Sequence, residues 1–313
     1  MHKEEITMIL IKERIGKLVE DLKELIYAKE VPVTSYRMLK SGERFLNVQD
    51  LRTDDWEELT SAELWGGHRE YFWFETVITI PKDFKDQWVV YELKTGREGL
   101  WDATNPQFTI YVNGFRRQGL DVNHREVLLT EKAEPGETFR IVLSAFTGDQ
   151  NFKLVMDSRI KVLDRETEQY YYDISVPYQV ARLLPDSDSA YLSIIHAVNE
   201  SLNLLDLRKE YSEEYYESLK KARQYMREEF YNKYSGNSKE TVYCVGHTHI
   251  DVAWLWTLAV TEDKAVRSFS TVLELMKQYP EYIFMSSQPQ LYKYVKKHAP
   301  EVYEEIQKRV AEG

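Results

Sequence analysis

Apolar side chains near the N-terminus recur at the spacing of a helix. Over residues 3–30 they return at alternating steps of three and four on an otherwise charged segment. The repeated positions are Met8, Ile11, Ile15, Leu18, Leu22 and Leu25. This period puts them on one helical face, and Val31-Pro32 predicts the end of the helix, so residues 1–31 form the first predicted region. We expect the stripe to pack on the protein's own later segments. A coiled-coil partner is the alternative, and the short repeat disfavours it.

The helical period is lost over residues 36–175. Runs rich in β-branched and aromatic residues alternate there with Gly, Pro, Asn and Asp clusters. The main runs are Tyr71–Ile80, Trp88–Leu93, Phe108–Val112, Phe139–Ser144 and Lys153–Val162. They predict an antiparallel β-sandwich, with domain bounds 32–175.

Aromatic residues of this predicted sandwich raise the question of sugar binding. An aromatic-plus-carboxylate patch with added polar contacts would draw on Trp65, Trp73, Trp101, Asp102, His68 and His124. Trp and Tyr are also ordinary core residues of such domains. We therefore favour a structural role for the aromatic residues.

Helical spacing returns over residues 176–236. Two apolar stripes run through it, namely Leu192, Ile195, Val198, Leu202 and Leu205, and then Tyr215, Leu219, Ala222, Met226 and Phe230. They predict two helices that link the sandwich to the last part of the chain, with an N-terminal cap among residues 186–189. Ser235-Gly236-Asn237 marks the next boundary.

Residues 237–313 predict strand, helix, strand, helix, helix. Val242–Val245 is an uninterrupted apolar run, as in a strand buried on both faces. Thr261 caps the expected helix, and Tyr282–Met285 is the second strand, which makes a parallel βαβ unit. A final helix begins near Pro300 and turns Val302, Ile306 and Val310 inward. One such unit cannot close a domain, so we expect it to begin a larger parallel α/β domain.

Chemically active side chains follow the first of these strands. His247, His249 and Asp251 alternate with other residues, so an extended backbone would turn all three to one side. Open α/β sheets bind ligands at this end of their strands. Imidazole and carboxylate together suit a divalent transition metal such as zinc. We favour a metal site over three polar residues that satisfy only one another.

Two tryptophans come directly after this cluster. Trp254 and Trp256 could form a wall on which a sugar stacks, or they could be core residues. Their spacing does not decide between these two roles.

Composition restricts the kind of protein and its partners. The chain has 313 residues, 43% hydrophobic and 30% charged, which is ordinary for a globular protein with two or more domains. A net charge of −11 disfavours nucleic acid and anionic membranes as partners. The single cysteine, Cys244, excludes an internal disulfide framework and fits a reducing, cytoplasmic location. No signal peptide or membrane span is expected.

A family resemblance rests on GHTHIDVAWLW and on the later segment FMSSQPQLYKYVKKHAPEVYEEIQKRVAEG. These segments resemble the start of the catalytic domain in class II α-mannosidases, the metal-dependent retaining glycosidases of glycoside hydrolase family 38. The resemblance is close over residues 240–313 and looser upstream. It implies that His249 and Asp251 bind the metal, and that Trp254 lines the sugar subsite with His247 as a neighbour. FTIYVNGFRRQGLDVNHREVLL likewise resembles a galactose-binding-like, jelly-roll sandwich.

The resemblance also implies a function. The chain would be the N-terminal portion of a retaining α-mannosidase, ending inside its catalytic domain and acting on oligosaccharides or small α-mannosides. Zinc would be its metal, although cobalt or another transition metal is compatible, as is a homo-oligomer. The family's nucleophilic Asp and a further His ligand follow later in the sequence than Gly313. We therefore expect this chain to be inactive by itself.

Other functional classes fit the residues less well. Metallo-β-lactamase-like enzymes carry a second His where this chain has Val252. Amidohydrolase barrels also begin with His-x-His, but they do not account for Asp251 followed by Trp254 and Trp256. A non-catalytic carbohydrate-binding or assembly fragment, centred on residues 36–175, would bind glycan even in the presence of a chelator.

Overall fold

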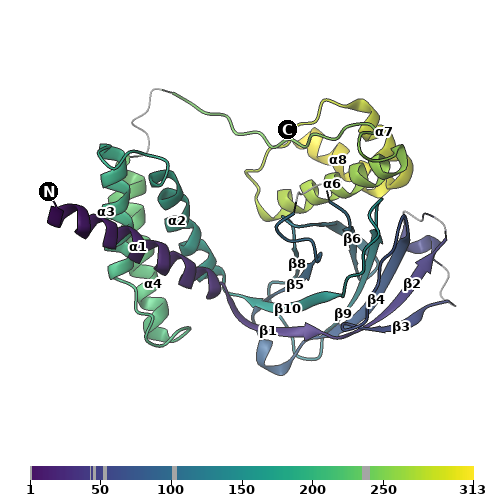
Figure 1. Ribbon diagram of the computed structural model, residues 1–313, viewed down its shortest axis with the longest axis horizontal. Coiled ribbons are helices and arrows are strands. Elements are labelled where there is room, and N and C mark those ends of the chain that lie inside the picture. The colour runs from purple at the N-terminus through teal and green to yellow at the C-terminus, as the bar shows by residue number, and fades with distance from the viewer. Residues whose placement is uncertain (1, 43, 45–46, 52–54, 101–103, 235–239) are drawn as a thin grey trace. The chain divides into compact units, whose positions relative to one another are not determined.

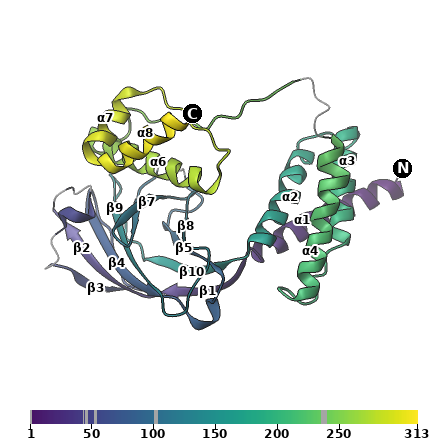
Figure 2. The ribbon, with the colours of Figure 1, turned by 180° about the vertical axis from the view of Figure 1, so that it is seen from behind.

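The computed structural model describes residues 2–42, 44, 47–51, 55–100, 104–234 and 240–313, without the side chains of residues 2–9. Trp101, Asp102, the side chain of Met8 and the predicted boundary at 235–237 lie outside the described residues. The chain forms two compact units, one of residues 1–30 and 161–242, the other of residues 31–160 and 243–313. Figures 1 and 2 show the elements of each from two sides.

The first unit is a helical bundle. Its main helices are α1 (His2–Glu24), α2 (Arg165–Ala181), α3 (Ser189–Asn203) and α4 (Glu213–Tyr225), after which come a π-helical turn (Met226–Tyr231) and α5 (Asn232–Tyr234). Ile15 and Leu22 of α1 are fully buried in the core that α2, α3 and α4 share. Packing of the N-terminal stripe on the protein's own later segments is thus confirmed for these two residues.

The predicted linker stripes form most of this core. Tyr215, Leu219, Ala222 and Met226 are fully buried, whereas Leu192 is exposed, so its place in the first stripe is wrong. Buried hydroxyls pair across the helices, with Thr167 Oγ1 2.7 Å from Tyr215 OH and Tyr170 OH 3.0 Å from Ser201 Oγ. Asp188 caps α3, inside the segment predicted to supply a cap.

Two predicted boundaries are wrong. The first helix ends at Glu24 and not at residue 30, because Tyr27–Val33 forms strand β1 at the edge of a sheet. Pro32 is tolerated there, since an edge strand has one unpaired side. Helix α2 begins at Arg165, so the last residues of the range predicted for the sandwich, 32–175, are helical. Asp164 starts α2 by accepting a hydrogen bond from Thr167 N at 2.8 Å.

Two β-sheets make up most of the second unit. One has four strands in the order β1, β10 (Asp157–Leu163), β5 (Trp88–Lys94) and β8 (Glu126–Thr130). The other has six, in the order β3 (Glu57–Thr60), β2 (Ser35–Ser41), β4 (Tyr71–Thr79), β9 (Thr138–Phe146), β6 (Gln107–Val112) and β7 (Phe115–Leu120). Neighbours in the six-stranded sheet run antiparallel, as predicted.

Aromatic residues fill the core beside the six-stranded sheet. The Trp65 ring lies 4.8 Å from Phe74 and 5.7 Å from Phe108 between centroids. Trp73 follows Phe72 along β4 and so faces the other side, where it packs against Tyr111. Trp65 and Trp73 are both buried, which confirms the structural role that we favoured for them.

The last part of the chain adds three helices to this unit, namely α6 (Leu258–Gln278), α7 (Pro289–His298) and α8 (Pro300–Glu312). Thr257, not Thr261, caps α6. Val310 is exposed rather than turned inward, whereas Val302 is buried as predicted. Among the described residues no helix has the length and apolar character needed to cross a membrane.

The predicted buried strand at residues 242–245 is wrong. Val242 and Tyr243 are exposed by 82% and 87%. The described residues form a single parallel bridge here, between Gly246 and Phe284. Its direction agrees with the predicted βαβ unit, but one bridge supplies neither the neighbouring strands nor the covering layers that bury a strand on both faces.

Helix α6 lies directly on strand β7. Gly119 N donates to Thr271 Oγ1 at 3.0 Å, and a Cβ on Gly119 would overlap Arg267 Cγ and lie 2.9 Å from its Cδ. Arg117 forms two hydrogen bonds with the buried carboxylate of Glu274, at 2.9 and 3.0 Å. The absence of a side chain at Gly119 therefore sets how closely α6 approaches the sheet.

We expect Leu22→Ala to lower the free energy of unfolding of the helical unit by about 2–5 kcal/mol, because it leaves a cavity in a filled core. Urea unfolding followed by the helical circular-dichroism signal measures this. Lys23→Ala, on the exposed side of the same helix, should change the value by less than about 0.5 kcal/mol. Equal effects of the two variants would contradict burial of Leu22.

We expect Gly119→Ala to destabilise the second unit by about 1–3 kcal/mol, because Arg267 Cγ is close to its own backbone and cannot swing aside freely. All 7 tryptophans belong to this unit, so unfolding followed by tryptophan fluorescence reports on it. Gly42→Ala is the control, since a Cβ there meets nothing within 4 Å. A stable Gly119→Ala variant would mean that α6 does not depend on this close approach.

Candidate functional site

A cavity of about 390 Å³ in the second unit contains the predicted site. Most of its lining comes from the 247–256 stretch, the loop between β7 and β8, and one side of α6, and Gln107, Gly119, Tyr282 and Phe284 complete it. The predicted site residues His247, His249, Asp251 and Trp254 all contribute to the lining. All four residues therefore face one cavity.

Hydrogen bonds to backbone carbonyls hold the segment 249–251 in place. Ile250 is buried, and its carbonyl accepts a hydrogen bond from Gln288 Nε2 at 3.1 Å. The Asp251 carbonyl accepts one from Thr261 Oγ1 at 3.4 Å. Because Ile250 turns inward, the side chains before and after it turn outward. His249 Nε2 and Asp251 Oδ1 consequently lie 3.1 Å apart, with both side chains accessible to solvent.

This pair of atoms fits a shared metal ion. Zinc binds imidazole nitrogen and carboxylate oxygen at about 2.0–2.2 Å, so two tetrahedral ligands lie about 3.4 Å from each other. The observed separation of 3.1 Å, at which the two atoms hydrogen-bond to each other, is close to that value. No group of three or more His, Cys, Asp or Glu side chains in the described part of the chain is arranged to hold a metal. His249 and Asp251 therefore offer part of a coordination shell, and His247 is not grouped with them.

The two tryptophans differ in their surroundings. Trp256 donates its indole N–H to Thr261 Oγ1 at 3.0 Å, and Lys264 Nζ lies 4.5 Å from its ring centroid. Trp254 meets Trp256 edge to face, with 5.4 Å between centroids, and is 53% exposed. Both tryptophans line the cavity, where Trp256 is anchored by its hydrogen bond and Trp254 is the more exposed aromatic surface.

The loop between β7 and β8 is the part of the site that the sequence did not identify. Asp121, Asn123 and His124 line the same cavity as His249. His124 was considered only for a patch on the sandwich, together with His68, which instead contacts Asp149 O at 2.8 Å. The motif at 247–251 has a recognisable spacing, but no spacing connects it with a loop so distant in the sequence.

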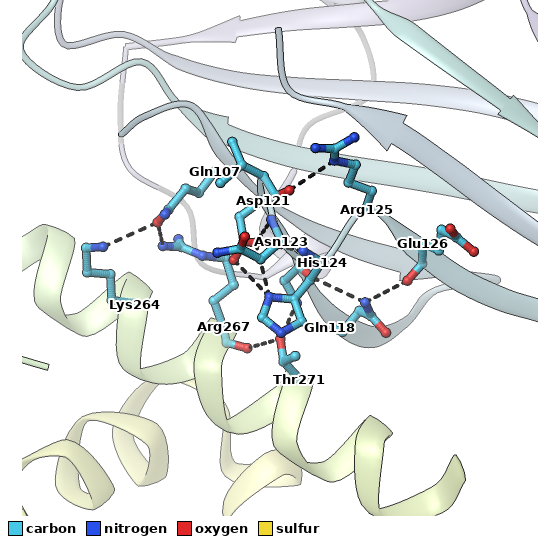
Figure 3. A network of polar contacts seen from close by, with 12 residues as sticks. Gln107, Gln118, Asp121, Asn123, His124, Arg125, Glu126, Lys264, Arg267 and Thr271 are labelled. Carbon is cyan, nitrogen blue, oxygen red and sulfur yellow. Dashed lines mark hydrogen bonds and ion pairs between the residues drawn. The ribbon is translucent and has the colours of Figure 1, made fainter. Parts of the chain in front are cut away.

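Asp121 and His124 form an ion pair in this loop, with His124 Nδ1 3.1 Å from Asp121 Oδ1 (Figure 3). Burial disfavours the charged carboxylate, but hydrogen bonds from the His124 ring and from two backbone N–H groups outweigh it and lower the pKa of Asp121. The same hydrogen bond raises the pKa of His124, against the effect of burial. Each residue therefore favours the charged form of the other.

Helix α6 supplies the cationic side of the cavity. Arg267 donates to Gln107 Oε1, which also accepts from Lys264 Nζ at 3.3 Å (Figure 3). Burial lowers the pKa of Arg267, and the charges of Asp263 and Asp121 oppose that shift. The cavity thus combines carboxylates, imidazoles, cations and an aromatic face, a mixture that suits a polar ligand with many hydroxyl groups.

Known structures resemble part of the chain only weakly. A beta-glucuronidase from an uncultured Clostridium species covers 44% of this chain and 29% of its own, at 12% identity and a TM-score of 0.33. A beta-glucuronidase from Ruminococcus gnavus covers 44% and 30%, at 13% identity and a TM-score of 0.32. TM-scores this low do not define the fold.

Sequence relatives are more informative. Residues 239–313 match the N-terminal domain of glycosyl hydrolases family 38. Alpha-mannosidase G of Dictyostelium discoideum is 26% identical over 96% of this chain and 29% of its own length. Alpha-mannosidase 2C1 of Homo sapiens is 25% identical over 96% and 30%. The chain thus spans about three tenths of these relatives. The chain thus carries a family 38 glycosyl hydrolase N-terminal domain at residues 239–313, and it is similar to alpha-mannosidases over most of its length.

Proposed function

We propose that the chain supplies the N-terminal part of a retaining, divalent-metal-dependent α-mannosidase that hydrolyses terminal α-mannosides of oligosaccharides. The observation that carries this proposal is the His249–Asp251 pair, which lies in one cavity with Trp254 and within the matched family domain. The names of the relatives support mannosides as the substrate class.

His249 and Asp251 would hold the metal, with zinc favoured by the nitrogen and oxygen donors and cobalt or another transition metal compatible with them. When bound, such an ion supplies positive charge that polarises and orients sugar oxygens. Trp254 offers its exposed ring as a stacking surface, and His247 adds a polar group at the cavity wall. These residues bind and orient a sugar, and we assign none of them the bond-breaking step.

A retaining glycosidase needs a carboxylate nucleophile and a second carboxylate about 5–5.5 Å away as acid and base. In the described part of the chain, the carboxylates that line the cavity are Asp121 and Asp251. Asp251 is assigned to the metal, and Asp121 is paired with His124. We therefore infer that both catalytic carboxylates belong to a longer polypeptide that includes this chain, and that the 313 residues alone do not hydrolyse mannosides.

The remaining sequence-based expectations form part of the same proposal. The two sheets would be the galactose-binding-like, jelly-roll domain that the sequence resembles, acting as a scaffold beside the catalytic domain. We also propose a cytoplasmic location, which the single cysteine supports, and a homo-oligomer is compatible with the proposal.

The first test changes one metal ligand in the full-length enzyme. Asp251→Asn keeps the shape of the side chain but removes its charge, so bound zinc and hydrolysis of an aryl α-mannoside should fall together. We expect kcat/KM to fall at least about 100-fold, because changes even beyond the directly bound ligands cost about 10–100-fold. His247→Ala should keep the metal and lose less activity. Full metal content and full activity in Asp251→Asn would refute the assignment.

The second test removes the metal itself. A chelator should abolish hydrolysis by the full-length enzyme, and added zinc should restore it. The 313-residue chain should bind zinc far more weakly than the full-length enzyme in titration calorimetry, because its pair of ligands leaves the coordination shell incomplete. Tight zinc binding or mannoside hydrolysis by the 313-residue chain would overturn the proposal that the remaining metal ligands and the catalytic carboxylates belong to a longer polypeptide.

A further inference from the structure

The loop between β7 and β8 is closed by its own hydrogen bonds. Asp121 Oδ1 accepts hydrogen bonds from the backbone N–H groups of Asn123 and His124, both at 2.8 Å. Asp121 N donates to the His124 carbonyl at 2.9 Å. These bonds close the turn from which the His124 ring projects.

The two nitrogens of the His124 ring differ in their contacts. Nδ1 contacts Asp121 Oδ1 at 3.1 Å and Oδ2 at 3.3 Å. No described group hydrogen-bonds Nε2, and the side chain is 44% exposed where it lines the cavity. A charged or neutral imidazole with a free nitrogen at a cavity wall can bond the hydroxyl group of a sugar.

The neighbours of the loop fix it against the rest of the unit. Arg267 and Thr271 of α6 lie next to Asp121 and His124 in Figure 3. Thr271 also accepts the N–H of Gly119, just before the loop. The loop, α6 and the 247–254 segment thus line one cavity.

We propose that His124, held by Asp121, binds the sugar on the leaving-group side of the scissile bond. This inference rests on the proposed α-mannosidase function. The groups suited to the terminal mannose, His249, Asp251 and Trp254, all come from one segment of the lining. We assign the second set of polar groups in this cavity, presented by a separate loop, to the adjoining residue of the glycan. His124 is accordingly a specificity-determining residue that favours oligosaccharides over mannosides with a simple leaving group.

The test compares two substrates of the full-length enzyme, an α-mannobiose and an aryl α-mannoside. His124→Phe keeps the ring volume but removes both nitrogens. It should lower the ratio of kcat/KM for the disaccharide to that for the aryl mannoside about tenfold, as expected for one lost hydrogen bond. His124→Gln carries an amide that can reach the Nε2 position, and it should recover part of the ratio.

The matched control is His68→Phe, which changes an exposed imidazole bound to Asp149 O outside this cavity and should leave the ratio as it is. Thermal melting of each variant identifies loss of structure. An unchanged ratio in His124→Phe, or equal losses on both substrates, would overturn the leaving-group assignment. Failure of the unaltered enzyme to hydrolyse either substrate would instead overturn the α-mannosidase function, and this inference with it.

Discussion

The contact of helix α6 with strand β7 is the constraint on which the site depends. Gly119 carries no side chain, so Arg267 lies against the strand and Thr271 bonds its backbone. The buried Glu274 carboxylate makes the contact specific, because it would be costly without the two hydrogen bonds from Arg117. With α6 fixed in this way, Thr261 near its start can hold the Asp251 carbonyl and the Trp256 indole. A backbone contact therefore positions the proposed metal ligands.

The sequence predicted local features of this arrangement well. Helical stripes identified the buried residues Ile15, Leu22, Tyr215 and Leu219, since a helix buries one face at a fixed period. The alternation of His249, Ile250 and Asp251 also correctly indicated that the two polar side chains share one side. The prediction that failed concerned burial, which depends on contacts between residues far apart in the sequence. The apolar run at 242–245 has the composition of a buried strand, but its burial requires strands and layers beside it.

The site itself could be predicted only in part, for the same reason. The 247–254 residues form a compact motif, so their chemistry was apparent from spacing. The contribution of Asp121 and His124 comes from tertiary packing, because β7 and α6 meet only in the folded unit. An Asp and a His on a short turn have no distinctive pattern, and many such turns are simply closed by their own hydrogen bonds. Only their position on the cavity wall distinguishes them.

The cavity joins parts of the chain that are made at different times. The contacts between Gln107 and Arg267 and between Arg117 and Glu274 span 160 and 157 residues. On a ribosome the sandwich strands therefore emerge and pair well before α6 exists, and they present an open face with Gly119 uncovered. Closing so long a loop carries an entropic cost that only the completed contact offsets. The wall of the cavity thus becomes a late product of synthesis, and binding of the proposed sugar ligand would report that the two halves have joined correctly.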